Sequence, residues 1–144
     1  MVNLSVELAG VTLKNPVIPA SGTFGYGREF AQVYDLDILG SFSFKGTTAQ
    51  PRFGNPQPRI AEAPGGMLNA VGLQNPGIDR VIEEELPSIA RLFHGPVIAN
   101  IGGNTVDEYA ENCRKLNGCE NVGLIEVNIS CPNVHCGGKN FGSD

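Results

Sequence analysis

The sequence contains no long apolar run, no excess of basic residues and no basic amino-terminal segment leading into an apolar stretch. No segment approaches the roughly 18 apolar residues that a membrane helix needs, so we expect no membrane span. Lysine and arginine number 10 against 15 aspartates and glutamates, which gives a formal net charge of −5. Because nucleic-acid binding depends on clustered positive charge, this balance argues against nucleic acid as a partner. The expected location is the cytoplasm.

The chain also lacks the cysteine spacing of a zinc site. Its four cysteines, Cys113, Cys119, Cys131 and Cys136, are separated by five, eleven and four residues. Zinc ligands usually come in tight pairs two to four residues apart, and only the last two cysteines could form one. Cys113 falls on the apolar stripe of an expected helix, which is an ordinary position for a small core residue. No metal site is therefore predicted.

What the sequence does contain is a regular alternation of strand-like and helix-like segments. Its 41% hydrophobic residues, 19 glycines and 10 prolines are typical of a globular, turn-rich α/β protein. Apolar runs predict buried strands at 16–20, 38–45, 96–102 and 122–129, after a hairpin formed by 4–8 and 11–13. Helices are expected at 28–34, 78–93 and 105–116. Pro87 should kink or split the second helix, and Thr105 with Glu108 should cap the third.

Strand and helix repeated in this order, with every strand apolar on both faces, indicate a parallel sheet. No Gly-x-Gly-x-x-Gly motif opens a helix, which lowers the case for a Rossmann fold and favours a TIM (β/α)8 barrel. A complete barrel takes about 250 residues. This chain has 144 and supplies the hairpin and about four βα units. We therefore predict that residues 1–144 are the amino-terminal half of a single TIM-barrel domain, truncated from a longer polypeptide.

Polar residues gather at the carboxyl ends of the predicted strands. They lie at 20–22, 45–47, 100 and 128–133, and a long loop at 46–77, rich in Pro, Gly and Asn, carries a further cluster at 69–73. In a parallel barrel all of these meet at one mouth, where ligands bind. Lys45 favours an anion or a polarised ring there, and the asparagines offer donors and acceptors together. A planar ligand rich in carbonyl and imide groups would satisfy this set. The alternatives are a lysine that extends into solvent and asparagines that are satisfied within turns.

Cys131 follows the last predicted strand and lies between Asn128 and Asn133. Pro132 stops ladder pairing directly after it, which places the thiol at a strand tip. A cysteine there can act as a nucleophile or a proton carrier, because neighbouring polar groups can bring its pKa toward the working pH. The alternative is an inert buried thiol, and the flanking asparagines favour the catalytic interpretation.

Five of these segments, in their order and approximate spacing, resemble the dihydroorotate dehydrogenases, and specifically the NAD-linked class built from two kinds of subunit. The matching segments are 20–25, 44–47, 69–77, 99–100 and 128–133. The resemblance extends over the whole chain. It implies FMN-dependent oxidation of dihydroorotate to orotate in pyrimidine (UMP) biosynthesis.

The resemblance also implies roles for individual residues. Cys131 matches the general base that removes a proton from C5 of dihydroorotate while C6 delivers a hydride to N5 of FMN. Flavin contacts are implied for Ser21, Lys45, Gly46, Asn100 and Asn128. Substrate contacts are implied for Lys45, Asn69, Ala70, Val71, Gly72, Leu73, Asn128 and Asn133.

Partners follow from the same resemblance. Similar enzymes pass electrons to a partner subunit that carries FAD and an iron–sulfur cluster, and then to NAD, and a homodimer of catalytic subunits is implied. The flavin phosphate is usually held by the loops after strands seven and eight of such barrels, so the isolated fragment is expected to bind FMN weakly and to be inactive. The alternatives are a related flavin enzyme that reduces pyrimidines and a catalytically silent scaffold half.

Overall fold

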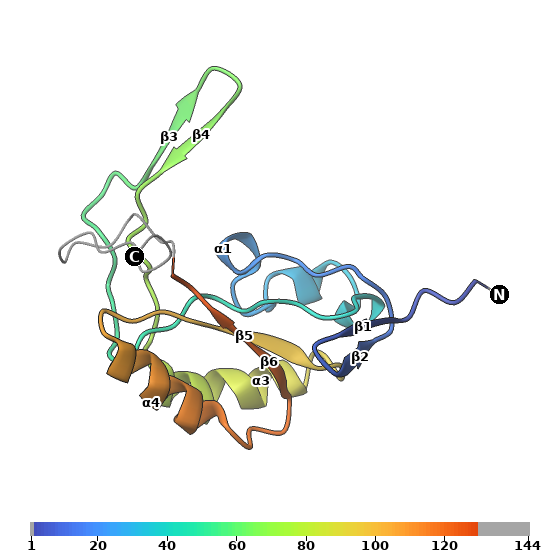
Figure 1. Ribbon diagram of the computed structural model, residues 1–144. Helices are drawn as coiled ribbons and strands as arrows, with labels where there is room; N and C mark the ends of the chain where they lie inside the picture. Colours follow the sequence, from blue (N-terminus) through green and yellow to red (C-terminus); the bar gives the residue numbers. More distant parts are fainter. Residues whose placement is uncertain (1, 130–144) are drawn as a thin grey trace.

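The computed structural model describes residues 2–129 (Figure 1). Cys131, Asn133 and Cys136 lie outside these residues, so what the sequence predicts for them stays a prediction. Within the described residues, every helix is too short or too polar to cross a membrane.

The first two strands form the predicted hairpin. β1 (Val6–Leu8) and β2 (Val11–Leu13) pair antiparallel, and Ala9 and Gly10 between them both have positive φ. A turn of two such residues has the twist that matches paired strands, so this prediction is confirmed.

Four extended segments then run side by side in chain order. β5 (Val97–Ile101) and β6 (Val122–Val127) pair in parallel. On the other side of β5, residues 41–47 run parallel to it through bridges from Ser43 to Ile98 and from Thr47 to Ile101. Residues 17–19 lie beyond, where their carbonyls accept hydrogen bonds from residues 40–43. The order is consistent with a partial (β/α) barrel, and the described segments form an open layer rather than a closed one.

Two of the predicted strands are less regular than expected. Residues 16–20 make no continuous ladder, because Pro16 and Pro19 lack the N–H groups that a ladder needs, and Val17 is 55% exposed. The strand predicted at 38–45 begins later, since the 3-10 turn η2 (Leu36–Ile38) occupies its start. The Asp35 side chain caps that turn by accepting the Asp37 N–H.

The helical segment between residues 41–47 and β5 is divided, as predicted for Pro87. It consists of α2 (Ile78–Arg80), the π-helical η3 (Val81–Glu85) and α3 (Leu86–Ala90). Pro87 lies in the first turn of α3, directly after the π turn. A proline ring clashes with the carbonyl four residues earlier in a regular α-helix, and the wider π turn relieves that clash. The prediction of a split helix is confirmed.

The helix between β5 and β6 also agrees with the sequence. α4 (Val106–Leu116) begins after Thr105, whose Oγ1 accepts the Glu108 N–H at 3.2 Å. The predicted helix at 28–34, in contrast, is wrong. Residues 28–34 contain only the 3-10 turn η1 (Phe30–Gln32), and the short helix α1 (Ser21–Phe24) precedes them. The Phe24 and Phe30 rings stack with centroids 4.5 Å apart, so aromatic packing fixes this segment where a seven-residue helix would be marginal.

The loop predicted at 46–77 contains a second hairpin that the sequence analysis missed. β3 (Ile60–Ala63) and β4 (Gly66–Asn69) pair antiparallel and project away from the rest of the molecule (Figure 1). Met67 and Leu68 are 64% and 66% exposed on it. This hairpin leads directly into the predicted substrate residues.

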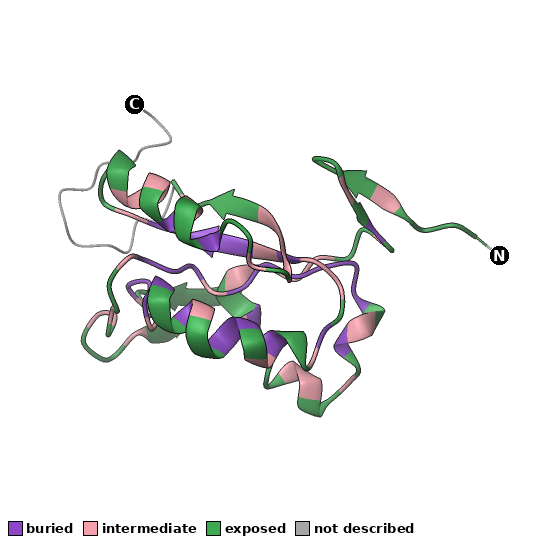
Figure 2. Ribbon diagram, turned by 90° about the horizontal axis from the view of Figure 1, so that it is seen from below, coloured by how far each residue is buried: buried purple, intermediate pink, exposed green. Residues whose placement is uncertain are grey.

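The core lies between the parallel layer and the helices that cover it, with β5 largely buried (Figure 2). The side chains of Val97, Ala99 and Ile101 are all 0% exposed. β6 departs from the prediction of a strand buried on both faces. Ile125 and Val127 are 38% and 48% exposed, because no described segment pairs with the outer edge of β6.

Candidate functional site

The carboxyl ends of residues 41–47, β5 and β6 are locked together by backbone hydrogen bonds. The Thr47 N–H donates to the Asn100 carbonyl at 3.0 Å, and the Gly102 N–H donates to the Thr47 carbonyl at 2.8 Å. The Asn128 N–H donates to the Ile101 carbonyl at 2.8 Å. These bonds bring the strand ends that the sequence marked as polar to one edge of the layer.

Gly46 marks the point where the strand ends converge. A methyl group on Gly46 would lie 2.7 Å from Asn100 Oδ1, 2.9 Å from Leu73 Cδ1 and 3.6 Å from Asn128 Nδ2. Asn128 Nδ2 in turn donates to Asn100 Oδ1 at 3.5 Å. Four residues predicted from distant parts of the sequence are therefore brought together here.

Lys45 directly precedes Gly46, and Ser21 is connected to Lys45 through Gly25, in the loop after α1. The Lys45 N–H donates to the Gly25 carbonyl at 2.9 Å, and the Gly25 N–H donates to the Ser21 carbonyl at 3.4 Å. The Thr47 hydroxyl donates to the Lys45 carbonyl at 2.8 Å. The backbone of Lys45 is thus fixed on both sides, and its half-buried side chain lies at the strand end.

The predicted substrate residues divide into two groups. Gly72 and Leu73 are buried, and Leu73 packs on Gly46. Asn69 ends β4, and Ala70 and Val71 follow it. Backbone hydrogen bonds of Ala70 and Val71 join this segment to residues 55–59. The Ala70 N–H donates to the Arg59 carbonyl at 2.7 Å, and the Val71 carbonyl accepts the Asn55 N–H at 3.0 Å.

Arg59 connects the residues before β3 to the residues after β4, and the sequence analysis did not identify it as a candidate residue. Its guanidinium donates to the Asn55 carbonyl at 2.6 Å, to the Phe53 carbonyl at 2.7 Å and to Gln74 Oε1 at 2.7 Å. A planar guanidinium suits three acceptors held in fixed directions. The sequence feature that could have pointed to Arg59 is the presence of an arginine in a loop otherwise rich in Pro, Gly and Asn.

Two further polar groups lie beneath the strand ends. The Ser43 hydroxyl donates to Glu126 Oε2 at 2.5 Å. Glu126 lies on β6, two residues before Asn128 in the sequence. The Tyr26 hydroxyl is buried and makes no hydrogen bond of good geometry within residues 2–129. Burial raises the pKa of Tyr26 to about 12, against a smaller lowering by the nearby Thr47 hydroxyl.

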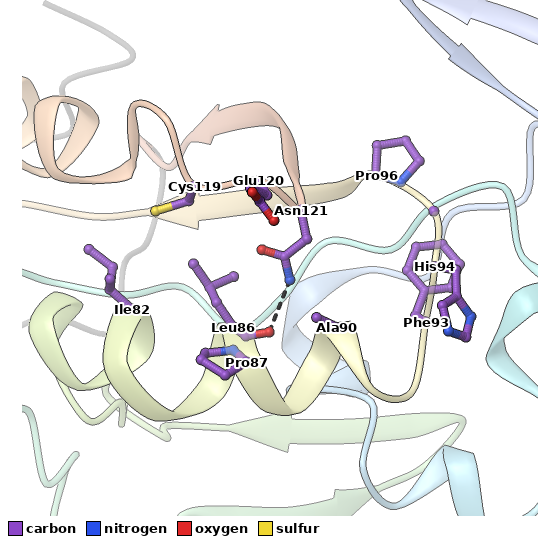
Figure 3. A pocket seen from close by; sticks show the side chains of 11 residues that line it. Ile82, Leu86, Pro87, Ala90, Phe93, His94, Pro96, Cys119, Glu120 and Asn121 are labelled. Carbon is purple, nitrogen blue, oxygen red and sulfur yellow. Dashed lines mark hydrogen bonds between the residues drawn. The ribbon is translucent and has the colours of Figure 1, made fainter.

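A pocket of about 540 Å³ lies at the opposite end of the layer, between α3 and the amino ends of β5 and β6 (Figure 3). It is lined by Ile82, Leu86, Pro87, Ala90, Phe93, His94, Gly95, Pro96, Cys119, Glu120 and Asn121. Within residues 2–129, none of the predicted site residues lines it. His94, at its rim, is paired with Asp37, whose carboxylate lies 2.6 Å from Nδ1.

Gly46, Leu73, Asn100 and Asn128 form what we call the strand-end cluster, and its chemical character is defined by these residues. The glycine lets Asn100 and Leu73 approach its backbone closely, Asn100 and Asn128 contribute amide donors and acceptors, and Leu73 supplies an apolar surface. Such a set can hold the edge of a planar heteroaromatic ring that alternates carbonyl and N–H groups. The residues present therefore fit the isoalloxazine edge of a flavin.

Comparison with known proteins gives matches to one family. The sequence pattern of the dihydroorotate dehydrogenase family matches residues 3–144. The chain is 59% identical over 143 residues to the catalytic subunit of dihydroorotate dehydrogenase B (NAD(+)) from Bacillus caldolyticus, covering 99% of this chain and 45% of the relative. It is 56% identical over 144 residues to the same subunit from Bacillus cytotoxicus, covering 100% of this chain and 46% of that relative. A crystal structure of the Eimeria tenella enzyme with ferulenol superposes with a TM-score of 0.71 at 27% identity, covering 92% of this chain and 38% of that one. The chain thus spans a little under half the length of these curated relatives.

Proposed function

Because this chain belongs to the dihydroorotate dehydrogenase family, which confirms the resemblance seen in the sequence, we propose that it forms the amino-terminal half of the catalytic subunit of an NAD-linked enzyme. In that subunit, a single TIM barrel, it takes part in the oxidation of dihydroorotate to orotate for pyrimidine synthesis in the cytoplasm. The convergence of Gly46, Leu73, Asn100 and Asn128 at one edge of the parallel layer carries this proposal. The polypeptide in which this sequence is continued by the rest of the barrel is called the full-length subunit below.

The residues of the cluster have distinct tasks in this proposal. Asn100 and Asn128, with Gly46 and Ser21, hold the flavin edge, and the rigid backbone at Lys45 sets the reach of its ammonium toward flavin and substrate. Asn69, Gly72, Leu73 and Asn133, with Ala70 and Val71, enclose the dihydroorotate. FMN, when bound, supplies the hydride acceptor that side chains cannot provide.

We propose that Cys131 is the general base of the reaction. Its thiolate takes the proton from C5 of dihydroorotate as the hydride leaves C6, so that the C5–C6 double bond of orotate forms. The partner would be an electron-transfer subunit whose FAD and iron–sulfur cluster would supply the route from FMN to NAD, within an assembly built on a dimer of catalytic subunits.

The proposal is tested by steady-state turnover of the full-length subunit together with its electron-transfer subunit. We expect Cys131→Ser to lower kcat by roughly 100- to 10,000-fold, the usual contribution of general base catalysis. Cys119→Ser is the matched control, because Cys119 is a free thiol at the distant pocket. Equal rates for the two variants would exclude Cys131 as the base. Turnover of pyrimidine reduction in place of dihydroorotate oxidation would favour the related reductase, and absence of bound flavin would favour a scaffold.

A further inference from the structure

One buried side chain, Asn75, connects the predicted substrate loop to the strand ends. Its Oδ1 accepts the N–H groups of Thr48 at 3.1 Å and Gly77 at 2.9 Å. Its Nδ2 donates to the Leu73 carbonyl at 2.8 Å and to the Thr48 hydroxyl at 3.0 Å. Asn75 is 6% exposed, and an amide offers two donors and two acceptor sites, so its capacity is filled by protein groups.

This set of partners also fixes the orientation of the amide. Turning it over would set the Nδ2 group against two N–H donors and Oδ1 against the Leu73 carbonyl. Asn75 therefore joins Thr48, near the start of the loop, to Leu73 and Gly77, near its end, and it uses both its donor and its acceptor to do so. Only a residue with both kinds of group can do this.

Leu73 needs such support because its backbone is in the left-handed region, with φ of 54°. That conformation is unfavourable for a residue with a Cβ and persists where its surroundings enforce it. Its side chain lies between two glycines at neighbouring strand ends. A methyl group on Gly46 would come within 2.9 Å of Leu73 Cδ1, and one on Gly102 within 3.1 Å of Leu73 Cδ2.

We propose that Asn75 is a positioning residue for the active site. By holding the Leu73 carbonyl it fixes the left-handed turn that seats Leu73 between Gly46 and Gly102, and so it sets the distance between the substrate residues at 69–73 and the flavin residues at the strand ends. Its consequence for catalysis rests on the proposed function. The side chain itself has no group left to contact substrate or flavin, so its effect is transmitted through Leu73.

The test is Asn75→Asp in the full-length subunit. Aspartate keeps the shape and both acceptors of asparagine, but it removes the donor to the Leu73 carbonyl and sets a carboxylate oxygen against it. Asn121→Asp is the matched control. Asn121 Nδ2 likewise donates to a backbone carbonyl, that of Leu86, at 3.0 Å, and it lies at the opposite end of the layer (Figure 3).

Two readouts separate this role from general stability. In hydrogen exchange, we expect segment 69–77 of the Asn75→Asp variant to exchange about tenfold faster than in the control. In turnover, we expect kcat/KM to fall by roughly 100-fold, chiefly through a higher KM for dihydroorotate, since a displacement of about 1 Å has effects of that size. Bound FMN should stay within about twofold of the control. Exchange and KM equal to those of the control would overturn the proposal.

A second variant covers the case in which the aspartate prevents folding. Leu73→Ala leaves the bonds of Asn75 intact and removes only the side chain between the glycines, so the proposal predicts the same rise in KM. An unchanged KM in Leu73→Ala would overturn it. If the unmodified subunit does not oxidise dihydroorotate, the proposed function fails, and the hydrogen-exchange comparison alone decides the role of Asn75.

Discussion

Replacing Gly46 by alanine tests whether the converging strand ends are as closely packed as the structure indicates. Gly46 does not have a positive φ, so its backbone conformation does not require a glycine. What requires a glycine here is the lack of space for a side chain. The added methyl would lie 2.7 Å from Asn100 Oδ1 and 2.9 Å from Leu73 Cδ1, and contacts under 3.0 Å force a neighbour to move. Asn100 is 2% exposed and its carbonyl is bonded to Thr47, so it has little freedom to yield.

We expect the Gly46→Ala substitution to destabilise the full-length subunit by about 1–3 kcal/mol, the range for an extra methyl group in a packed interior. The same displacement would reach the proposed flavin edge. If the free energy of FMN binding is weakened by the same amount, about 1–3 kcal/mol, the dissociation constant for FMN rises roughly 5- to 150-fold. Urea unfolding measures the first quantity, and titration of the apoprotein with FMN, followed by flavin fluorescence, measures the second.

Gly66→Ala is the matched control for this prediction. Gly66 also lacks a positive φ, and nothing lies within 4 Å of the position that its methyl would take. We expect that control to change the free energy of unfolding by no more than about 0.5 kcal/mol. If Gly46→Ala unfolds and binds FMN as Gly66→Ala does, the close approach of the strand ends is not a feature of the site.

Three further predictions concern the surroundings of the site. Arg59→Lys leaves one ammonium facing three acceptors, so segment 53–74 should exchange amide hydrogens about tenfold faster, and unchanged exchange would contradict the bridging role of Arg59. The pKa of Tyr26 is raised to about 12 by burial, so the unfolded chain ionises first and stability should fall as the pH rises between about 10 and 12. Tyr26→Phe should lessen that fall, measured as a fall in melting temperature, and a fall equal to that of the unmodified protein would refute the assignment. Hydrogen bonds from the His94 backbone and ring lower the pKa of Asp37, so its stabilisation should be present above the ordinary carboxyl pKa and be lost on acidification through the lowered value. Asp37→Asn should therefore show a smaller loss of melting temperature on acidification from about pH 5 to pH 3, and a loss equal to that of the unmodified protein would count against this reasoning.

The sequence predicted the parallel layer and its site because both depend on local patterns. Apolar runs placed β5 and β6, and the capping residue Thr105 placed α4 between them. Parallel strands bring their carboxyl ends to one edge, so Gly46, Asn100 and Asn128 could be grouped before any contact was known.

Contacts that depend on the path of a loop were beyond the sequence. Arg59 meets Gln74 only because the loop folds back after β4, and no spacing rule predicts that return. The same holds for Ser43 and Glu126, which are far apart in sequence and meet across the layer. At 16–20 the apolar pattern favoured a buried strand, but the N–H groups missing at Pro16 and Pro19 outweighed it.

We propose above that the strand-end cluster belongs to a flavin site that oxidises dihydroorotate. The most direct measurement mixes the full-length subunit with dihydroorotate in the absence of oxygen and follows absorption at about 450 nm, where oxidised flavin absorbs. We expect a flavin band in the purified subunit and its loss on mixing. At equal flavin content this loss should be roughly 5- to 150-fold slower in Gly46→Ala than in Gly66→Ala, which corresponds to a cost of about 1–3 kcal/mol at the site. A subunit without a flavin band, or a band that dihydroorotate leaves unchanged, would contradict the proposal.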